Sequence, residues 1–260
     1  MQEEYNSLLE SDTWIITKRP ENHNVISSKW VFAIKQGPNG EIDRFKARLV
    51  ARGFTQVEGV DYFETYSPVA KMSTIRIVLS LATAKGMVIK QLDVKTAFLN
   101  GPLDEEIFME QPMGFECDEN SVCKLKKSIY GYKQASRQWN LVLNEFLLKI
   151  GFKQIESDKC VYKRNSCLLV VYVNDMLLCS DDEQEINSAV ESLGKEFAIK
   201  NLGEPQFCLG MRITRDLQKK RIFIDQEKYC GDILKRFGFE GLNPISTPME
   251  VGLKLPLIEC

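Results

Sequence analysis

The feature that most constrains the fold is a continuous apolar run, CLLVVYV at 167–173, which is followed after Asn174-Asp175 by a second run, MLLCS at 176–180. Each run is far shorter than the roughly 20 apolar residues that a membrane-spanning helix needs. Short apolar runs that are rich in β-branched residues and bounded by a turn signal are typical of buried strands. The sequence therefore predicts two buried strands joined by a tight turn, with Asp175 in the turn.

Helical and extended patterns surround this hairpin. Apolar residues recur at helical spacing in 74–86, 136–151 and 183–197. A strand is predicted over 87–94, and a strand, a Gly-Pro-Asn-Gly turn and a second strand over 28–53. Because helices and strands alternate without the glycine fingerprint of a parallel sheet, the pattern favours an α+β fold with a sheet backed by helices on one face.

Composition limits the class of protein. The chain has 260 residues, a formal net charge of −2 and 44% hydrophobic residues, which is ordinary globular usage. These values exclude a polybasic tail protein and an acidic solvating domain, and they allow one large domain or two closely packed subdomains. The first residues lack the basic-then-apolar layout of a signal peptide, so we expect a soluble, intracellular protein with no membrane partner.

Cysteine and histidine usage disfavours zinc and nucleophilic chemistry. The chain has eight cysteines, no two of them at CxxC spacing, and a single histidine, His23. A closed zinc site or a Cys-His pair would have to be assembled from scattered positions. Most of the cysteines lie in apolar runs, where small buried thiols are the expected state.

Charge is distributed unevenly along the chain. Lys29 to Arg52 contains six basic and two acidic residues, and Lys124 to Arg137 contains five basic and no acidic ones. Both stretches also carry aromatic residues, a combination that suits a groove following a phosphate backbone and stacking bases. The alternative is that they are solvated faces of a strand and a helix.

Two acids stand at positions that a sheet can bring together. Asp93 ends the strand predicted over 87–94, and Asp175 lies in the hairpin turn. If the two strands are neighbours, the carboxylates converge at one edge, as a site for metal-assisted phosphoryl transfer requires. Spacing alone does not decide this, because single acids at strand ends and Asn-Asp turns are common.

Several long motifs follow one another along most of the chain: KARLVARGFTQ (46–56), YSPVAKMSTIRIVLSLA (66–82), LDVKTAFLNGPLDEEIFMEQPMGF (92–115), CKLKKSIYGYKQASRQWN (123–140), YVNDMLL (172–178) and FAIKNLGEPQFCLGMRI (197–213). In this order they resemble the reverse transcriptase of copia-type LTR retrotransposons. Ordered motifs of this length are far more specific than a single short pattern.

The resemblance implies a right-hand polymerase with an antiparallel palm sheet backed by helices. Residues 1–86 would be mainly fingers, 87–205 palm with a fingers segment at about 102–135, and 206–260 the primer grip and partial thumb. The implied activity is RNA-directed DNA polymerisation on an RNA or DNA template with a primer, using deoxynucleoside triphosphates. Two Mg²⁺ ions, with Mn²⁺ as an alternative, are the implied cofactors. Association with other polyprotein parts follows too, in a cytoplasmic virus-like particle or in the nucleus.

The resemblance also assigns roles to residues near the nucleotide. Asp93 corresponds to the first palm aspartate, which binds both metals, and Phe98 to an aromatic gate against a 2′-hydroxyl. Lys46 and Arg48 resemble the pair that contacts the triphosphate through charge-assisted hydrogen bonds, although exposed charges on a hairpin are the alternative.

A second group of residues is implied to contact the base and the nucleic acid strands. Tyr130 and Gly131 match the motif that contacts template and incoming base, where glycine permits a close backbone approach. Lys133 and Arg137 are implied to grip phosphate, unless they are simply solvent-facing. The remaining residues, implied to form a primer grip or else an ordinary core strand, are Phe207, Leu209 and Gly210.

The sequence departs from the family pattern at two places. The palm turn usually reads Tyr-Val-Asp-Asp, whereas Asn174 stands here in front of Asp175. An amide offers a neutral oxygen to a hard dication, so metal binding and activity should both be weakened. This favours an alternative function, a non-catalytic nucleic-acid-binding remnant; a scaffold without nucleic acid would leave both basic stretches unused. The second departure is Ser136 in place of Pro at the start of the following helix; serine is an acceptable helix cap, so we expect this change to be harmless.

Overall fold

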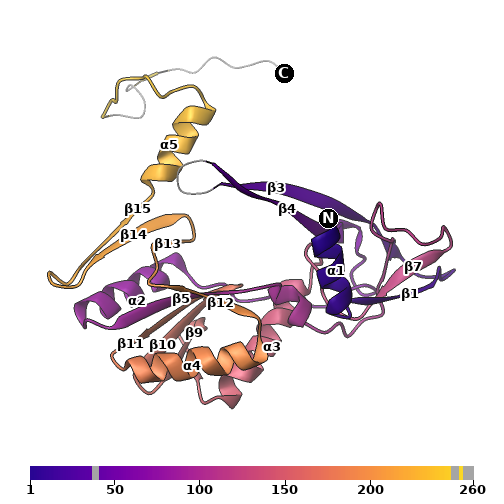
Figure 1. Cartoon of the computed structure of the whole chain (residues 1–260), viewed down its shortest axis with the longest axis horizontal. Helices are drawn as coiled ribbons and strands as arrows, with labels where there is room; N and C mark the ends of the chain where they lie inside the picture. The colour runs from indigo at the N-terminus through magenta and orange to yellow at the C-terminus, as the bar shows by residue number, and fades with distance from the viewer. Residues whose placement is uncertain (37–40, 247–251, 254–260) are drawn as a thin grey trace.

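The computed structural model describes residues 1–36, 41–246 and 252–253. This part of the chain is a mixed α+β fold with several sheets (Figure 1). Its helices are α1 (Gln2–Glu10), α2 (Met72–Ala84), α3 (Ala135–Lys149), α4 (Glu183–Glu196) and α5 (Glu227–Arg236), with short 3-10 turns η1 (Gly53–Thr55) and η2 (Ala97–Asn100). None of its helices is long and apolar enough to cross a membrane.

The largest sheet has six strands in the order β12-β5-β11-β10-β9-β8, and all neighbours run antiparallel, as predicted. Its strands are β5 (Val88–Val94), β8 (Lys153–Ile155), β9 (Asp158–Arg164), β10 (Cys167–Tyr172), β11 (Asp175–Ser180) and β12 (Ile199–Gly203). The predicted apolar hairpin is confirmed, but Tyr172 pairs with Asp175, so the turn residues are Val173 and Asn174. Asp175 is therefore the first residue of β11 and not a turn residue.

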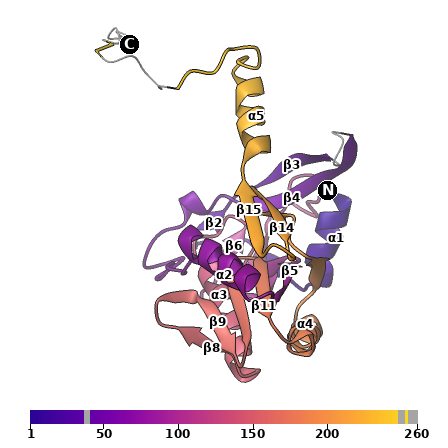
Figure 2. The same cartoon turned by 90° about the vertical axis from the view of Figure 1, so that its left-hand side faces the viewer.

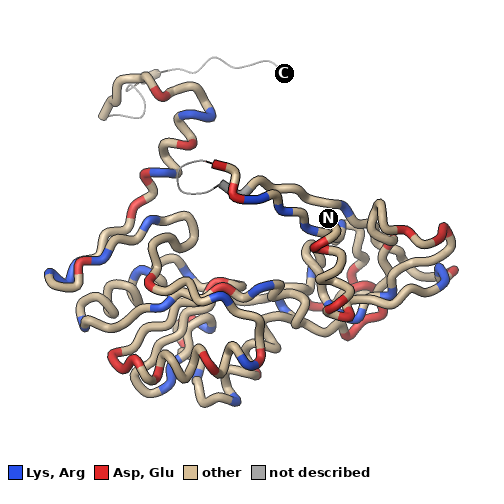
Figure 3. Tube along the Cα trace, viewed as in Figure 1, with Lys and Arg blue, Asp and Glu red and all other residues tan. Residues whose placement is uncertain are grey.

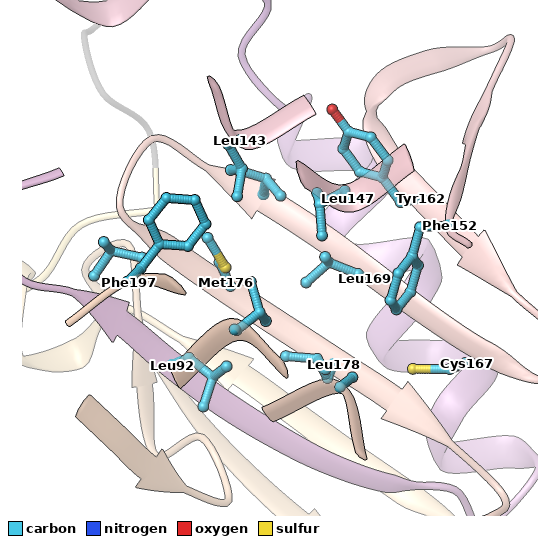
Figure 4. Close-up of a cluster of buried hydrophobic side chains, with 14 of the residues drawn as sticks. Leu92, Leu143, Leu147, Phe152, Tyr162, Cys167, Leu169, Met176, Leu178 and Phe197 are labelled. Carbon is cyan, nitrogen blue, oxygen red and sulfur yellow. The ribbon is translucent and has the colours of Figure 1, made fainter. Parts of the chain in front are cut away.

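Helices cover both faces of this sheet, so the expectation of helices on one face is wrong. One face packs on α3 and α4 through Leu143, Leu193 and their neighbours (Figure 4), while α2 packs on the other through Leu79. The reason lies in the continuous apolar run of β10. Successive side chains of a strand point to opposite faces, so such a run supplies apolar side chains to both layers.

Three smaller sheets complete the fold. The first has the order β1-β7-β6-β2, the second pairs β3 with β4, and the third has the order β13-β14-β15. Their strands are β1 (Trp14–Lys18), β2 (Val25–Ile26), β3 (Ser28–Gln36), β4 (Ile42–Ala51), β6 (Phe108–Met109), β7 (Ser121–Leu125), β13 (Phe207–Cys208), β14 (Met211–Asp216) and β15 (Arg221–Asp225). The predicted basic hairpin is the β3–β4 ribbon; its Gly-Pro-Asn-Gly turn, 37–40, lies outside the described residues.

Side chains from other elements fix the ends of α2. The buried Asp158 of β9 accepts hydrogen bonds from the Lys71 N–H at 3.2 Å and from the Thr74 hydroxyl at 2.7 Å, at the start of the helix. At its end, the Arg215 guanidinium from β14 donates to the carbonyl oxygen of Ala82. Both contacts are tertiary, so they tie α2 to the large sheet and to the β13–β15 sheet.

The start of α3 differs from the sequence expectation. The helix begins at Ala135 after Gln134, and no side chain accepts a capping hydrogen bond there. Ser136 already lies in the first turn, where its backbone carbonyl accepts from the Ser67 hydroxyl. Ser136 therefore does not cap the helix.

The C-terminal helix α5 lies away from the layered core. It follows β15 and projects from the body of the molecule (Figure 2), and none of its residues is buried. Its apolar side chains, including Ile233 and Leu234, are exposed. This part of the chain therefore depends on local helix formation.

Candidate functional site

Two aspartates face each other across neighbouring strands of the large sheet. Asp93 of β5 is directly opposite Asp175 of β11. The N–H of Val94 donates to the Asn174 carbonyl at 2.9 Å, which makes Asp93 and Asp175 a non-hydrogen-bonded pair. Cα atoms in such pairs are roughly 4.5 Å apart and their side chains lie close together. The strands are thus neighbours, which was the condition for the carboxylates to converge.

Each of these carboxylates faces a side-chain amide. Asn174 Nδ2 donates a hydrogen bond of 2.8 Å to Asp93 Oδ1. Gln91 Nε2 lies 3.5 Å from Asp175 Oδ1, at the outer limit of a hydrogen bond. Burial, and after it the charge of Asp93, raises the pKa of Asp175. The charge of Asp93 therefore disfavours the charged form of Asp175.

The backbone of the β10–β11 turn is anchored independently of the Asn174 side chain. Trp139 Nε1 donates to the Val173 carbonyl at 2.7 Å, and Val94 binds the next carbonyl. Val173 has a φ of +57°, an unfavourable value for a β-branched residue. Such strain persists only where the surroundings hold the residue in place. The turn is therefore a fixed platform for residue 174.

The residues at this edge do not fit a two-ion metal site as they stand. Among the described residues no group of three or more His, Cys, Asp or Glu side chains could hold a metal ion. The nearest set consists of Asp93, Asp175 and the Asn174 amide, whose nitrogen points at Asp93. Hard dications require oxygen ligands, and this amide presents a donor instead.

The cysteines agree with the sequence expectation. Those in the described part are free, and most are buried, such as Cys160 and Cys179. Burial raises the pKa of each of these two thiols to about 12, which keeps them protonated and unreactive.

Phe98, Tyr130 and Arg48 form a contiguous group beside the aspartates. The Phe98 and Tyr130 rings meet edge to face with centroids 4.9 Å apart, and the Arg48 guanidinium carbon lies 5.2 Å from the Tyr130 centroid. Burial raises the pKa of Tyr130; Arg48 opposes this effect and the charge of Asp93 adds to it. Three residues with predicted nucleotide roles thus touch one another, and one of them, Tyr130, is within electrostatic reach of Asp93.

Lys46 shares a face of the β3–β4 ribbon with Arg48, because the two are separated by one residue. Basic residues are spaced along this ribbon (Figure 3). Glu4 of α1 lies close to both, and burial raises its pKa against the opposing effect of the two cations. The ribbon therefore presents positive charge on the side of α1 and Tyr130.

Gly131 has a packing role that sequence reasoning missed. Its φ is +94°, and a Cβ added to it would lie 2.1 Å from the Ala51 carbonyl oxygen. The N–H of Ala51 donates to the Tyr130 carbonyl at 2.8 Å. Close contact between these two backbone segments requires glycine whether or not a nucleotide approaches.

Lys133 and Arg137 contact the 62–66 segment, and Lys133 shares a cavity with Val173 of the β10–β11 turn. Lys133 Nζ is 4.8 Å from the ring centroid of Tyr62, and Arg137 Nη1 donates to the Tyr66 carbonyl at 3.3 Å. Lys133 borders a cavity of about 500 Å³ that Trp139, Val171 and Val173 also line. Both cations are thus placed by contacts with the 62–66 segment.

Phe207, Leu209 and Gly210 lie in the separate β13–β15 sheet. Phe207 is exposed, while Leu209 and Gly210 form the β13–β14 turn with φ values of +50° and +78°. Burial raises the pKa of the intervening Cys208 to about 11, and the charge of Asp175 contributes. The segment therefore approaches the aspartate pair from a different sheet.

Two residues at the site escaped sequence reasoning. Lys200 of β12 stands opposite Asp93 on its other side; this long-range pairing leaves no local signal. Gln91 could have been found, because it precedes Asp93 by two positions and so shares its face of the strand.

The chain matches known sequences over nearly all of its length. The family model described as "Reverse transcriptase (RNA-dependent DNA polymerase)" matches residues 11–251. The Retrovirus-related Pol polyprotein from transposon TNT 1-94 of Nicotiana tabacum is 42% identical over 100% of this chain and 20% of its own length. That from transposon RE1 of Arabidopsis thaliana is 36% identical over 99% of this chain and 18% of its own. The chain thus spans about a fifth of these relatives.

Proposed function

Because the chain belongs to the reverse transcriptase (RNA-dependent DNA polymerase) family, we propose that it holds primed template and deoxynucleoside triphosphate in a right-hand polymerase fold whose polymerisation is strongly impaired by Asn174. It corresponds to the reverse transcriptase part of copia-type Pol polyproteins. The observation that carries the proposal is the Asp93–Asp175 pair, with the Asn174 amide bound to one of its carboxylates.

The proposed division of the hand follows the sheets. Residues 1–86, mainly fingers, contain the β3–β4 ribbon; 87–205, the palm with its fingers segment at about 102–135, contain most of the large sheet. Residues 206–260 contain the β13–β15 sheet and α5, as the primer grip and partial thumb. Other polyprotein parts would be its partners, in a cytoplasmic virus-like particle or in the nucleus.

The proposed nucleotide site lies between the ribbon and the aspartates. Lys46 and Arg48 would bind phosphate oxygens by charge-assisted hydrogen bonds. Phe98, held by Tyr130, would exclude a 2′-hydroxyl. Support comes from the positive face of the ribbon and from the proximity of Tyr130 to Asp93.

The nucleic acid strands would lie on either side of the β10–β11 turn. Lys133 and Arg137 would bind phosphates on the side of the cavity, and the Phe207–Gly210 segment would hold the primer. The two groups flank the aspartates on different elements, which suits a groove with the reacting end at its floor.

Reverse transcriptases generally use divalent metal ions. For the form with aspartate at 174 we propose Mg²⁺, with Mn²⁺ as an alternative, bound by Asp93, Asp175 and the new carboxylate. The ions would supply charge neutralisation at the transferring phosphoryl group. In the chain as it stands, Asp93 and Asp175 supply only part of that ligand set.

The test is primer extension on an RNA template by the purified chain and by Asn174→Asp. We expect the variant to extend the primer at least about 10²-fold faster, since loss of one preorganised electrostatic contact costs roughly that in other enzymes. Asn165→Asp, a substitution in the β9–β10 turn, is the matched control and should not change the rate. Equal rates for the unmodified chain and Asn174→Asp would show that the amide suffices.

The second candidate is a nucleic-acid-binding remnant without catalysis, which the Asn174 contact favours. The test is affinity for an RNA–DNA hybrid as a function of salt, for the chain and for the double variant Arg48→Gln/Lys133→Gln. The plot of log K against log salt has a negative slope, and each lost phosphate contact should reduce its magnitude by about 1. Lys153→Gln/Lys159→Gln removes two exposed lysines from the β8–β9 hairpin as a control. Absence of binding at low salt would contradict both candidates.

A further inference from the structure

The Asn174 amide occupies the position at which a cation would act on Asp93. Asp93 and Asp175 are held side by side by strand pairing, so their charges need a compensating partner. The 2.8 Å hydrogen bond from Asn174 Nδ2 supplies one. We infer that this amide compensates the charge of the aspartate pair in place of a divalent ion, so that the folded protein neither requires nor binds Mg²⁺ or Mn²⁺ at this edge.

The direction of the amide follows from chemistry. An ionised carboxylate only accepts hydrogen bonds, so the group facing Asp93 must be the NH₂ of Asn174. Turning the amide round would place its oxygen against a carboxylate oxygen. An ion at Asp93 Oδ1 would therefore have to displace this hydrogen bond and turn the amide round, and would gain from Asn174 only a neutral oxygen in place of a carboxylate.

Neighbouring groups strengthen the arrangement. Gln91 Nε2 faces Asp175 at 3.5 Å, so both carboxylates point at neutral donors. The turn backbone, fixed by Trp139 and Val94, keeps Asn174 within reach of Asp93. Lys200 of β12 is the strand partner of Asp93 on the side away from β11. Each feature reduces the affinity of the pair for a dication.

This inference goes beyond the proposed function, because it concerns the protein without nucleic acid and its test measures no polymerisation. The melting temperature would be measured in EDTA and in millimolar Mg²⁺ or Mn²⁺, and bound Mn²⁺ would be counted by electron paramagnetic resonance. For the unmodified chain we expect no bound Mn²⁺ and a melting shift below about 1 °C, because a ligand that does not bind the native state cannot stabilise it.

Asn174→Asp should behave in the opposite way. It replaces the donor with a third negative charge, so in EDTA we expect melting to fall by about 3 °C or more. Mn²⁺ should bind to the variant and restore most of this loss. Primer extension can fail for reasons of substrate binding without affecting these readouts, so the two proposals fail separately.

The matched control is Asn165→Asp. Asn165 lies in the β9–β10 turn, at the other end of the same sheet, and its Nδ2 donates to Glu185 Oε1 at 2.7 Å. The substitution makes the same chemical change at a carboxylate without a paired aspartate. We expect a modest fall in melting temperature that Mn²⁺ does not reverse.

Two results would overturn the inference. The first is that the unmodified chain binds Mn²⁺ and is stabilised by it as much as Asn174→Asp is, and that Asp175→Asn loses both effects. The second result concerns Asn174→Ala, which is used if Asn174→Asp does not fold. This variant removes the donor without adding charge, and we expect it to gain Mn²⁺-dependent stabilisation. No gain in that variant would show that the amide does not exclude the ion.

Discussion

The central sheet and helix α5 place similar side chains in opposite environments. Every residue of β11 after Asp175 is buried, whereas α5 has no buried residue in the described part of the chain. Leu178 of β11 is 0% exposed and Leu234 of α5 is 45% exposed. The sheet is covered on both faces by α2, α3 and α4, and α5 has no such layer. Amphipathic pattern alone therefore does not tell whether a segment is fixed by packing.

The difference separates the parts of the candidate site that packing fixes from those that it does not. The aspartate pair lies on two central strands, β5 and β11, so its geometry is set by the core. The base of the β3–β4 ribbon is packed through Trp30, Leu49 and Ala51, the last of which meets Gly131, while its outer part carries exposed Phe32 and Phe45. Substitutions should therefore be costly in the sheet and at the ribbon's base, and nearly silent in the outer segments.

The largest effect is expected at the base of the ribbon. Gly131→Ala should destabilise the protein by more than about 4 kcal/mol, because it adds backbone strain to an overlap with the Ala51 carbonyl. Gly238, which follows α5, has a φ of +69° and open space around it. Gly238→Ala should therefore cost only about 1 kcal/mol of the unfolding free energy. Urea denaturation measures both. Similar values for the two would mean that the Gly131 contact is not tightly packed.

A matched leucine pair tests the comparison directly. Leu178→Ala should cost about 3 kcal/mol, the loss expected for a fully buried leucine that leaves a cavity. Leu234→Ala in α5 should change the unfolding free energy by less than about 0.5 kcal/mol. A large loss at Leu234 would show that α5 is buried in solution against a partner surface.

The smallest effect concerns the tertiary cap of α2 and depends on pH. Burial tends to raise the pKa of Asp158, but hydrogen bonds from Thr74, Cys160 and Lys71 outweigh it and lower the pKa below its ordinary value. A lowered pKa stabilises the fold above the unfolded-state value, and this stabilisation is lost as pH falls through the folded-state value.

Asp158→Asn should therefore cost about 1–2 kcal/mol at pH 7, and the difference from the unmodified chain should shrink in acid. Unfolding of both proteins would be followed over pH. Asp43→Asn, an exposed change in the ribbon, is the control and should cost almost nothing. A difference that stays constant with pH would exclude charge as its cause.

Local patterns predicted the elements whose signals are continuous in sequence. Helices expected over 74–86, 136–151 and 183–197 occur as α2, α3 and α4, with ends displaced by no more than two residues. The basic hairpin and the apolar hairpin also occur where expected. The packing of α2 on the second face of the sheet was not predicted, and neither was the pairing of β12 with β5. Each of these contacts joins segments that are distant in the chain.

The candidate site was predicted in part for the same reason. The sequence placed Asp93 at a strand end and Asp175 in the hairpin turn, one residue away from its position at the start of β11, and the family resemblance identified Asn174 as a lost ligand. It did not show that the Asn174 amide would donate to Asp93, since that depends on the register of β5 against β11. Nor did it show the contact between Gly131 and Ala51, where two segments meet backbone to backbone.

The anchoring of the β10–β11 turn has an evolutionary consequence. Trp139 and Val94 hold the backbone of the turn through its carbonyls, so a chain with either Asn or Asp at 174 can form it. Cellular surveillance of misfolded proteins would find little to act on in the Asn form. The codons of Asn and Asp differ by a single purine transition. On the proposed function, a copy impaired in this way keeps its fold, and the reverse transition suffices to return the carboxylate.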